Sequence, residues 1–420
     1  MRNTTLAVSG LLLGLSSSQA FADQQHYRNV VTGERAQGLG GAYSGVSDDA
    51  SGVFYNPGGL AFAQSNDISG SANAFYSKTA TYKKAIPGGD DWKEKSGGTF
   101  APFFGTMQKM DAVYPGLVGG FAYYTLDTEL KDQDSLLVDK AGIARYHRSA
   151  NQKAATWAGT GALAYRVSPA LGIGMSIGYI NVDELVQISQ NYTLTNGAEY
   201  YMSSTRESLV AHGMQFGLGV QWAASAKVVF GASLRTGSYA SQKYFQTADS
   251  LVYVTGKSLS SDPTVVKSNN PLGSMPLELR GGVAVYASTK LLLTSDVDWH
   301  AAVDDTDQQA TIVSMYTKES VLNYAVGSEY YMTPSVPLRL GYFTNKDATP
   351  KIIAGKKNQP DHVDYQGLSI FLAMAQPNSQ ISVGGVFQTG KGQAQKLGGT
   401  TIQSVTASAY NIGFSATHNF

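Results

Sequence analysis

The feature that most constrains this chain is an alternation of large apolar residues with very small ones. In the segment Leu171–Ile180, which reads LGIGMSIGYI, every second residue is large and apolar, and the residues between are Gly or Ser. A β-strand places such sets on opposite faces. Gly and Ser fill too little volume to build a core, so the large set must meet an apolar medium outside the strand. Lipid meets this requirement, and β-structure crosses a bilayer only as a closed barrel.

The same alternation recurs along the chain, for example in Met214–Trp222, Leu291–Trp299 and Leu368–Met374. Some of the strands carry charged residues, such as Glu278, Arg280 and Arg339. An Arg or Lys that faces lipid near the midplane costs about 2–4 kcal/mol. We therefore predict that these three side chains point into the lumen.

The alternation predicts about fourteen strands. They lie at 65–79, 97–108, 116–127, 152–168, 170–189, 207–224, 227–240, 275–287, 290–302, 319–332, 337–345, 364–376, 379–389 and 405–420. Short connections alternate with long polar ones at 80–96, 128–151, 190–206, 241–274, 303–318, 346–363 and 390–404. This layout is typical of outer-membrane barrels. The predicted fold is an all-β, fourteen-stranded antiparallel transmembrane β-barrel over residues 65–420.

The N-terminus predicts export. Arg2, the apolar stretch Leu6–Leu15 and the Ala20-Phe21-Ala22 cleavage pattern indicate a signal peptide over residues 1–22. The chain contains Cys 0, which excludes disulfides and thiolate metal sites. A formal net charge of +0 gives no indication of a nucleic-acid partner. We expect a protein of the Gram-negative cell outer membrane.

Residues 23–64 do not follow the barrel pattern. They are rich in Gly, Ala and Ser and show no sustained period of two. A barrel of about fourteen strands encloses a lumen too wide for wall side chains alone to fill. We therefore predict that this stretch, hereafter the hatch segment, plugs the lumen.

The hatch segment resembles that of the FadL/TodX family (OMPP1), outer-membrane channels for long-chain fatty acids and aromatic hydrocarbons. The matching residues are Gly33–Tyr43, Asp48–Ser51 and Tyr55–Leu60, with Gly58 where the family has Ala. Three further matches lie in the barrel, at Leu163–Tyr179, Val326–Phe343 and Asn411–Phe420. The resemblance thus covers nearly all of the chain after the signal peptide.

The resemblance implies roles for three groups of residues. The hatch would use Arg35, Gly40, Gly41, Asp48, Asp49, Asn56, Pro57 and Gly58. A kink in the third strand, which opens a lateral gap in the wall of family members, would use Pro115, Gly119 and Gly120. Two long loops that capture ligand would use Tyr192, Leu194, Tyr200, Tyr201, Met202, Tyr244, Phe245, Leu251 and Tyr253.

Each role has a plainer alternative. The proline could simply begin a strand that the glycines weaken. The loop aromatics could pack against each other or form a girdle at the rim. Asn56 and Pro57 would form a rigid turn, because proline fixes its own backbone and biases the preceding residue to an extended conformation. Arg35, Asp48 and Asp49 would need partners among wall charges such as Arg280, Glu278 or Arg339.

Other kinds of site are poorly supported. Gly38–Gly41 lacks the Lys-Ser/Thr pair of a phosphate loop, and Asp304–Asp307 lacks the Gly and distal Glu of a calcium loop. His300 with Asp296 and Asp298 could indicate an enzyme, but no nucleophile accompanies them, and a lumen hydrogen-bond network is the expectation. We predict no enzyme activity, no cofactor and no metal.

The sequence therefore predicts a channel for passive uptake of long-chain fatty acids or other small hydrophobic compounds. Its partners would be a hydrophobic ligand, outer-membrane lipid and, through the C-terminal Phe420, the barrel-assembly machinery. The family resemblance implies a monomer. Three alternatives stay open: a docking scaffold for a secretion system, a barrel enzyme and an aqueous porin.

Overall fold

The computed structural model describes residues 25–86, 89–97, 101–140, 143–194, 199–254, 257–269, 274–303, 317–356, 359–396 and 401–420. The predicted signal peptide, residues 1–22, and the stretch Asp304–Asp307 lie outside these ranges. Among the described residues, no helix is long and apolar enough to cross a membrane.

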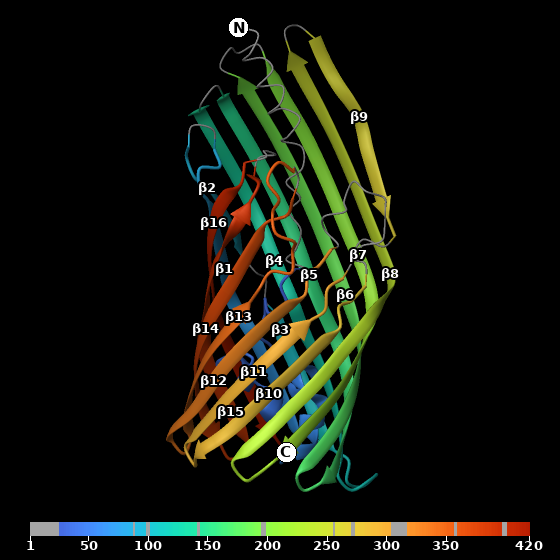
Figure 1. Ribbon diagram of the computed structural model, residues 1–420, viewed down its shortest axis with the longest axis vertical. Helices are drawn as coiled ribbons and strands as arrows, with labels where there is room; N and C mark the ends of the chain where they lie inside the picture. Colours follow the sequence, from blue (N-terminus) through green and yellow to red (C-terminus); the bar gives the residue numbers. More distant parts are fainter. Residues whose placement is uncertain are drawn as a thin grey trace.

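The chain forms short helices near its N-terminus and strands throughout the rest (Figure 1). The helices are α2 (Glu34–Gly38), η1 (Ser44–Val46), α3 (Gly52–Tyr55) and η2 (Pro57–Phe62). The first eight strands are β1 (Asp67–Tyr82), β2 (Trp92–Gly97), β3 (Ala101–Lys109), β4 (Leu117–Lys140), β5 (Ile143–Ser168), β6 (Leu171–Leu194), β7 (Tyr200–Ala223) and β8 (Val228–Val254). The others are β9 (Lys257–Ser268), β10 (Glu278–Ser288), β11 (Leu291–His300), β12 (Val321–Thr333), β13 (Val336–Asn345), β14 (His362–Gln376), β15 (Ser379–Ala394) and β16 (Gln403–Asn419).

These strands form a closed antiparallel barrel of fourteen positions. The first strand, β1, pairs with the last, β16, and this ladder closes the ring. Strands β2 and β3 share the position between β1 and β4, and β8 pairs directly with β10. In the described part of the chain, strand β9 pairs with the far end of β8. The predicted fold class and all fourteen predicted strand positions are confirmed.

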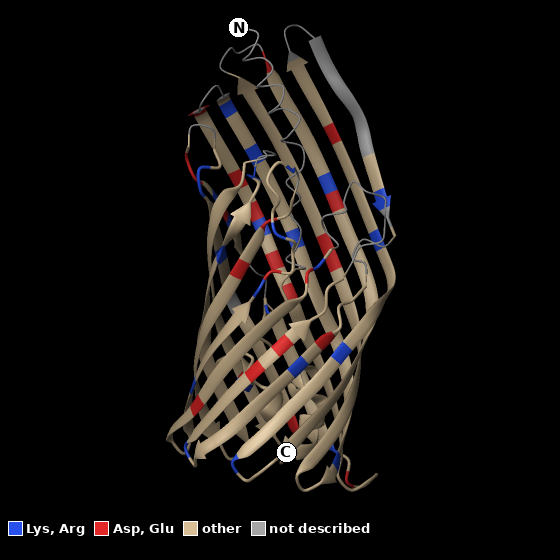
Figure 2. Ribbon diagram, viewed as in Figure 1, with Lys and Arg blue, Asp and Glu red and all other residues tan. Residues whose placement is uncertain are grey.

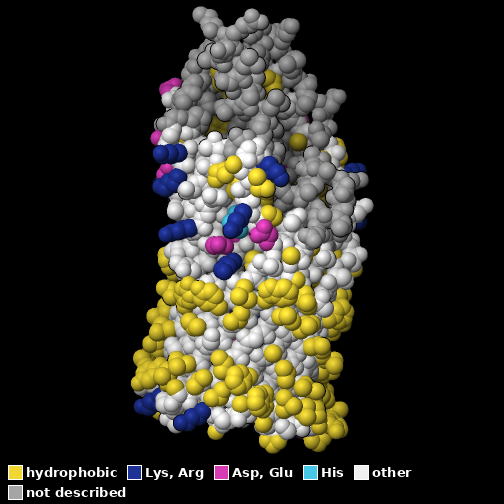
Figure 3. Space-filling view, in the orientation of Figure 1, with side chains coloured by type: hydrophobic (Ala, Val, Ile, Leu, Met, Phe, Trp, Pro, Cys, Tyr) yellow, Lys and Arg dark blue, Asp and Glu magenta, His cyan; other side chains and the backbone are white. Residues whose placement is uncertain are grey.

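The alternating apolar residues face outward. On β6, the exposed fraction is 45% for Ile173, 59% for Met175 and 50% for Ile177. In Figure 3 hydrophobic side chains gather over the lower part of the barrel, and the charged side chains visible on this face lie above them or at the lower rim. Figure 2 shows further charged residues along the lower strands themselves. On β6 the apolar run covers about nine residues, the length that a tilted strand needs to cross a bilayer. Glu278, Arg280 and Arg339 are buried and point inward, as predicted.

Aromatic residues mark the upper edge of this apolar belt. Tyr123, Trp157 and Tyr179 lie side by side on β4, β5 and β6, with ring centroids 5.5 and 5.7 Å apart. The Tyr179 hydroxyl lies 2.7 Å from Nδ1 of His212 on β7. Such a row suits the interface between lipid and water, because each ring is largely apolar with one polar edge.

The predicted long loops at 128–151, 190–206 and 241–274 are largely strand. Strands β4 to β8 continue well beyond the apolar belt and form the tall side of the barrel (Figure 1). Their ladders continue there, for example at Leu136–His147 and Tyr192–Tyr201. The sequence pattern missed these extensions because their outer face meets water, so the apolar alternation ends while the hydrogen bonding goes on.

The hatch segment lies inside the lower part of the barrel, against the small residues of the inner wall (Figure 1). A Cβ at Gly174 of β6 would collide with the Pro57 backbone, and one at Gly58 would lie 2.7 Å from the Gly219 backbone. Gly40 and Gly41 adopt positive φ angles of 63° and 80°, which favour glycine. The small set of the alternation therefore makes room for the hatch segment.

Candidate functional site

The hatch segment is tied to the wall by a chain of alternating charges. Arg35 donates from Nη2 to Oε1 of Glu329 at 2.9 Å, and from Nη1 to Oδ1 of Asp48 at 3.2 Å. Glu329 of β12 also accepts from Nε of Arg339 at 2.6 Å. Arg339 of β13 donates in turn to Oε1 of Glu34 at 2.8 Å. This lattice neutralises charges that would be costly to bury singly.

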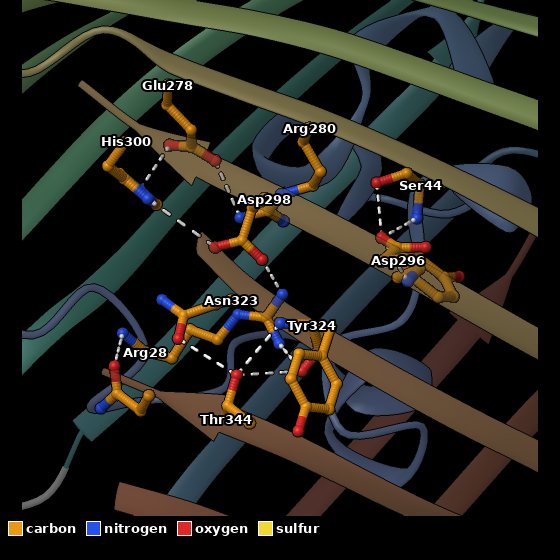
Figure 4. Close-up of polar contacts among 12 residues, drawn as sticks. Arg28, Ser44, Glu278, Arg280, Asp296, Asp298, His300, Asn323, Tyr324 and Thr344 are labelled. Atoms are coloured by element: carbon orange, nitrogen blue, oxygen red, sulfur yellow. Dashed lines mark hydrogen bonds and ion pairs between the residues drawn. The ribbon is translucent and has the colours of Figure 1, made fainter. Parts of the chain in front are cut away.

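A second polar cluster lies where the hatch segment meets β10 to β13 (Figure 4). Arg28 pairs with Asp298 through Nη2 and donates from Nη1 to the Tyr324 carbonyl at 3.3 Å. The carboxylate of Asp296 accepts from the backbone N–H groups of Tyr43 and Ser44 at 3.1 and 2.9 Å. Asp296 therefore fixes the start of η1 against the wall.

Two neighbouring residues complete this cluster. His300 lies 3.7 Å from both Glu278 and Asp298, measured between ring nitrogen and carboxylate oxygen. Glu278 pairs with Arg280 at 2.8 Å and with Arg235 at 3.3 Å. The arrangement is the lumen hydrogen-bond network expected for His300. Among the described residues no group of three or more His, Asp or Glu side chains could hold a metal ion.

Asn56 holds the turn into η2. Its extended backbone, with φ −159° and ψ 100°, is the conformation that a following proline favours. The Asn56 amide donates to the carbonyls of Ser44 and Val220 at 2.9 Å each, and its Oδ1 accepts from the Gly58 N–H at 3.1 Å. One buried side chain thus joins two hatch elements to β7.

The predicted partners of the hatch charges are only partly the observed ones. Arg35 pairs with Glu329 instead of Glu278, and Arg339 meets Glu34 instead of Asp48 or Asp49. Asp49 bonds locally to the backbone of Ser51 at 2.8 Å. Burial raises the pKa of Asp48 to about 6, with Asp49 adding to the rise and Arg35 opposing it.

Above the hatch segment, the inner wall is aromatic. The cluster comprises Tyr82, Ala85, Ile86, Trp92, Tyr146, Tyr192, Leu194, Tyr201, Val363, Tyr365, Ala394, Val405 and Ala407. Tyr192 and Tyr201 stack with ring centroids 5.1 Å apart, and the ring centroids of Tyr192 and Tyr146 are 6.5 Å apart. We name this set the upper-lumen cluster. It offers an apolar lining on the side of the barrel where the tall strands end.

The predicted capture residues lie on strands β6, β7 and β8, not in loops, and they divide between two faces. Tyr192, Leu194, Tyr201 and Tyr244 are buried and face inward. Tyr200, Met202 and Phe245 are exposed, and Leu251 and Tyr253 share that outer face through their pairing with Met202 and Tyr200. Alternation along paired strands separates neighbours such as Tyr200 and Tyr201, so these residues cannot form one groove.

The predicted kink is also misplaced. Pro115 lies in the turn before β4, while Gly119 and Gly120 pair with β3 on one side and with β5 on the other. Complete pairing on both edges leaves no gap at these glycines.

A bulge lies higher on the same strand, where the β4–β5 ladder shifts its register between Thr125 and Asp127. A cavity of about 10 Å³ lies here, enough for about one water molecule. It is lined by Asn29, Val30, Asn73, Tyr76, Ala101, Asp127, Thr128 and Asn411.

The sequence analysis did not identify several residues of this site. Glu34, Glu329 and Arg28 take part in the ion pairs of the hatch segment, and Asn29 donates to Asp127 at the β4 bulge at 3.0 Å. The alternation could have placed Glu329, since Val326 and Tyr330 on the same strand face outward. No pattern in the sequence marks Arg28 or Asn29, because the N-terminal stretch that holds them has no regular structure.

Comparison with known proteins supports the fold. No family model matches this chain, and no curated protein matches it. Among solved structures, TodX, the Pseudomonas putida toluene transporter, shares 14% identity over 93% of this chain and 98% of its own, with a TM-score of 0.65. A Pseudomonas aeruginosa FadL homologue shares 15% identity over 96% of this chain and 100% of its own, with a TM-score of 0.62. TbuX, the Ralstonia pickettii toluene transporter, shares 12% identity over 94% of this chain and 100% of its own, with a TM-score of 0.57. The chain therefore has the fold of the FadL and TodX barrels, as the sequence resemblance implies.

Proposed function

We propose that this chain is an outer-membrane channel through which small hydrophobic compounds diffuse into the cell. The observation that carries the proposal is the upper-lumen cluster, an inward-facing aromatic lining above a hatch segment that fills the lower lumen. Buried aromatic walls inside an otherwise polar lumen suit an apolar ligand. Solved structures of this fold include toluene transporters, which agrees with the proposal.

The route has three steps. A ligand enters between the tall strands and binds among Tyr146, Tyr192 and Tyr201. It then passes toward the bulge of β4, where a rearrangement of Asn29 and Asp127 opens the wall. Release through the wall at this height, just above the aromatic row at the membrane interface, avoids the charge lattice below. The hatch segment, held by Arg35 and Asn56, keeps the lower lumen closed to water and ions.

Uptake measurements test this function. Wild-type protein, expressed in a host that lacks channels of this kind, is expected to increase uptake of labelled toluene or dodecanoate. The inner double variant Tyr192→Ala/Tyr201→Ala should reduce uptake at least about fivefold, because each removed aromatic ring contributes about 1 kcal/mol to the free energy of ligand binding.

The matched control is the outer double variant Tyr200→Ala/Tyr253→Ala, whose rings stack on the outer face with centroids 5.2 Å apart. It should leave uptake unchanged. Equal losses in both variants would contradict binding at the upper-lumen cluster. Co-purification with a secreted protein, without any uptake, would favour the docking scaffold instead.

A further inference from the structure

We propose that Gln152 and Glu207 form a specificity-determining site, which holds the hydroxyl group of an otherwise apolar ligand on the inner wall of the tall strands. This inference rests on the proposed function and names the class of ligand: a hydrophobic alcohol or phenol in preference to a hydrocarbon or an acid.

Gln152 and Glu207 face the lumen in one row across three paired strands. Gln152 of β5 pairs with Val186 of β6, and Val186 pairs with Glu207 of β7. The exposed fraction is 1% for Gln152, 1% for Val186 and 3% for Glu207. Neighbouring strands lie about 4.8 Å apart, so about 10 Å separates the main chains of Gln152 and Glu207. Long side chains that point inward from a concave wall converge across such a distance.

Both side chains keep buried polar atoms that no described residue binds. Neither Oε1 nor Nε2 of Gln152 has a hydrogen-bond partner in the described part of the chain. Glu207 accepts through Oε1 from the Gln246 amide at 2.8 Å, and the Tyr244 hydroxyl lies beside the same carboxylate. Its Oε2 has no partner among the described residues. Buried polar atoms are nearly always hydrogen-bonded, so these three atoms are suited to bind a polar group from outside the chain.

The donors and acceptors of this row match a hydroxyl group. Gln152 offers both a donor and an acceptor, and Oε2 of Glu207 offers an acceptor. A ligand hydroxyl can donate to Glu207 and accept from Gln152 at the same time. A hydrocarbon binds none of these atoms, and an ammonium group cannot accept from the Gln152 amide. Because both ends of that amide are unbound, either of its orientations leads to the same conclusion.

Neighbouring charges disfavour an acid at this row. Glu184 of β6 is 2% exposed and faces the lumen beside Glu207, since it pairs with the next inward residue of β7, Leu209. Lys131 of β4 pairs with Gln152, but its ammonium binds Glu94 at 3.0 Å. A ligand carboxylate would therefore meet two carboxylates of the wall, and like charges at short range destabilise each other.

An apolar wall lies directly below the row. A buried cluster on β6 to β8 comprises Val182, Leu209, Ala211 and Tyr244. Leu209 follows Glu207 as the next inward residue of β7, and it pairs with Tyr244. A ligand with its hydroxyl group at Gln152 and Glu207 can lay its apolar part along this wall. A few polar groups beside an apolar lining are what fixes the orientation of a ligand in a pocket.

The row also lies on the route of the ligand. On β5, Gln152 lies between Tyr146 of the upper-lumen cluster and Thr156, which pairs with Asp127 at the β4 bulge. A ligand that moves from the aromatic lining toward the bulge therefore passes Gln152.

Binding of four matched probes tests the inference. Toluene, p-cresol, p-toluate and benzylamine share one aromatic ring and differ in their polar group. Affinities are measured in lipid nanodiscs at neutral pH, with binding to empty nanodiscs subtracted. The wild-type protein should bind p-cresol at least about tenfold more tightly than each of the other three, as expected for two buried hydrogen bonds.

The double variant Gln152→Leu/Glu207→Leu replaces the polar groups by apolar groups of similar size. It should lose the preference for p-cresol while it still binds toluene, and Glu207→Gln should retain the preference because an amide oxygen also accepts from a hydroxyl. The matched control is Asn151→Leu/Arg206→Leu, which changes two exposed residues of the outer face that both pair with Gln187. This control should leave all four affinities unchanged.

Equal wild-type affinities for toluene and p-cresol would overturn the inference, even if the leucine variant failed to fold. So would a leucine variant that keeps its heat-modifiable mobility and either retains the preference or loses all four probes alike. Tighter binding of p-toluate or benzylamine than of p-cresol would assign the site to an ion and refute the choice of a hydroxyl group.

Toluene uptake in cells separates the two proposals. If the wild-type protein takes up toluene but shows no preference for p-cresol, only the role of Gln152 and Glu207 fails. If it takes up neither toluene nor p-cresol, the channel function itself fails.

Discussion

Arg35 of the hatch segment holds both carboxylate oxygens of Glu329, with Nε and Nη2 donating at 3.1 and 2.9 Å. Glu329 is almost fully buried on β12, so this bidentate pair joins the hatch segment to the wall in a water-poor setting. Arg35 is thus one electrostatic link between the two, beside the Glu34–Arg339 and Arg28–Asp298 pairs.

Replacing Arg35 by Ala should loosen the hatch segment. After this substitution, Arg339 is the remaining ion-pair partner of Glu329. The free energy needed to move the hatch segment away from the wall should fall by about 3 kcal/mol. Ion conductance measured in planar bilayers should then rise well above that of the wild type. Arg145→Ala, an exposed arginine on the outer face of β5, is the control. An unchanged conductance in Arg35→Ala would refute the locking role.

Asn56→Ala should destabilise the turn into η2. It removes the three hydrogen bonds of the Asn56 side chain, which bind the carbonyls of Ser44 and Val220 and the N–H of Gly58. Each lost hydrogen bond costs about 0.5–1.5 kcal/mol. Hydrogen exchange of residues 57–62 should accelerate. The control Asn378→Ala lies in the turn between β14 and β15 and should not change the hydrogen exchange of residues 57–62. Equal acceleration of exchange in both variants would contradict the prediction.

A single methyl group on the inner wall should displace the hatch segment. Gly174→Ala places its Cβ against the Pro57 backbone, where neither main chain can move freely. Overpacking of this kind costs about 1–3 kcal/mol. Conductance should rise, as for Arg35→Ala. Gly161→Ala is the matched control, because a Cβ there meets nothing within 4 Å; a comparable rise in this variant would show that strand glycines matter for another reason.

The pKa of Asp48 predicts a pH dependence of the hatch segment. Burial raises that pKa from 3.8 to about 6, so the seated hatch binds this proton more tightly than the unseated chain. Between about pH 4 and 6 the seated state holds more protons, so its stability falls as pH rises. Protection factors of hatch amides should therefore be higher at pH 4.5 than at pH 7.

Asp48→Asn removes the titrating group and should flatten this dependence. The side chain of Asp48 keeps 31% of its surface exposed, which allows proton exchange with solvent. If the protection factors of the wild-type hatch amides did not change between pH 4.5 and 7, or if they rose with pH, the seated hatch would not favour protonated Asp48.

Much of the fold could be predicted because membrane-facing strands carry a strong local signal. Residues such as Ile173 and Met175 must be large and apolar, and their neighbours Gly174 and Ser176 must leave room inside. Asn56 could also be predicted as a turn residue, since the following Pro57 restricts its backbone. These properties depend on near neighbours in the chain.

The predictions that failed concern contacts between distant segments. Tyr200 and Tyr201 differ by one position, yet only the pairing of β7 with β6 and β8 decides which of them faces the lumen. Gly119 and Gly120 suit a kink, but complete ladders on both sides prevent one.

The sequence by itself determined a closed barrel in lipid, because the period of two and the bilayer's demand for paired backbone leave no other solution. Tertiary structure alone decided that Arg35 meets Glu329 and that Asn29 meets Asp127. Ion pairs inside a lumen form between residues that are hundreds of positions apart in the sequence. Local sequence patterns do not show which of these residues come together.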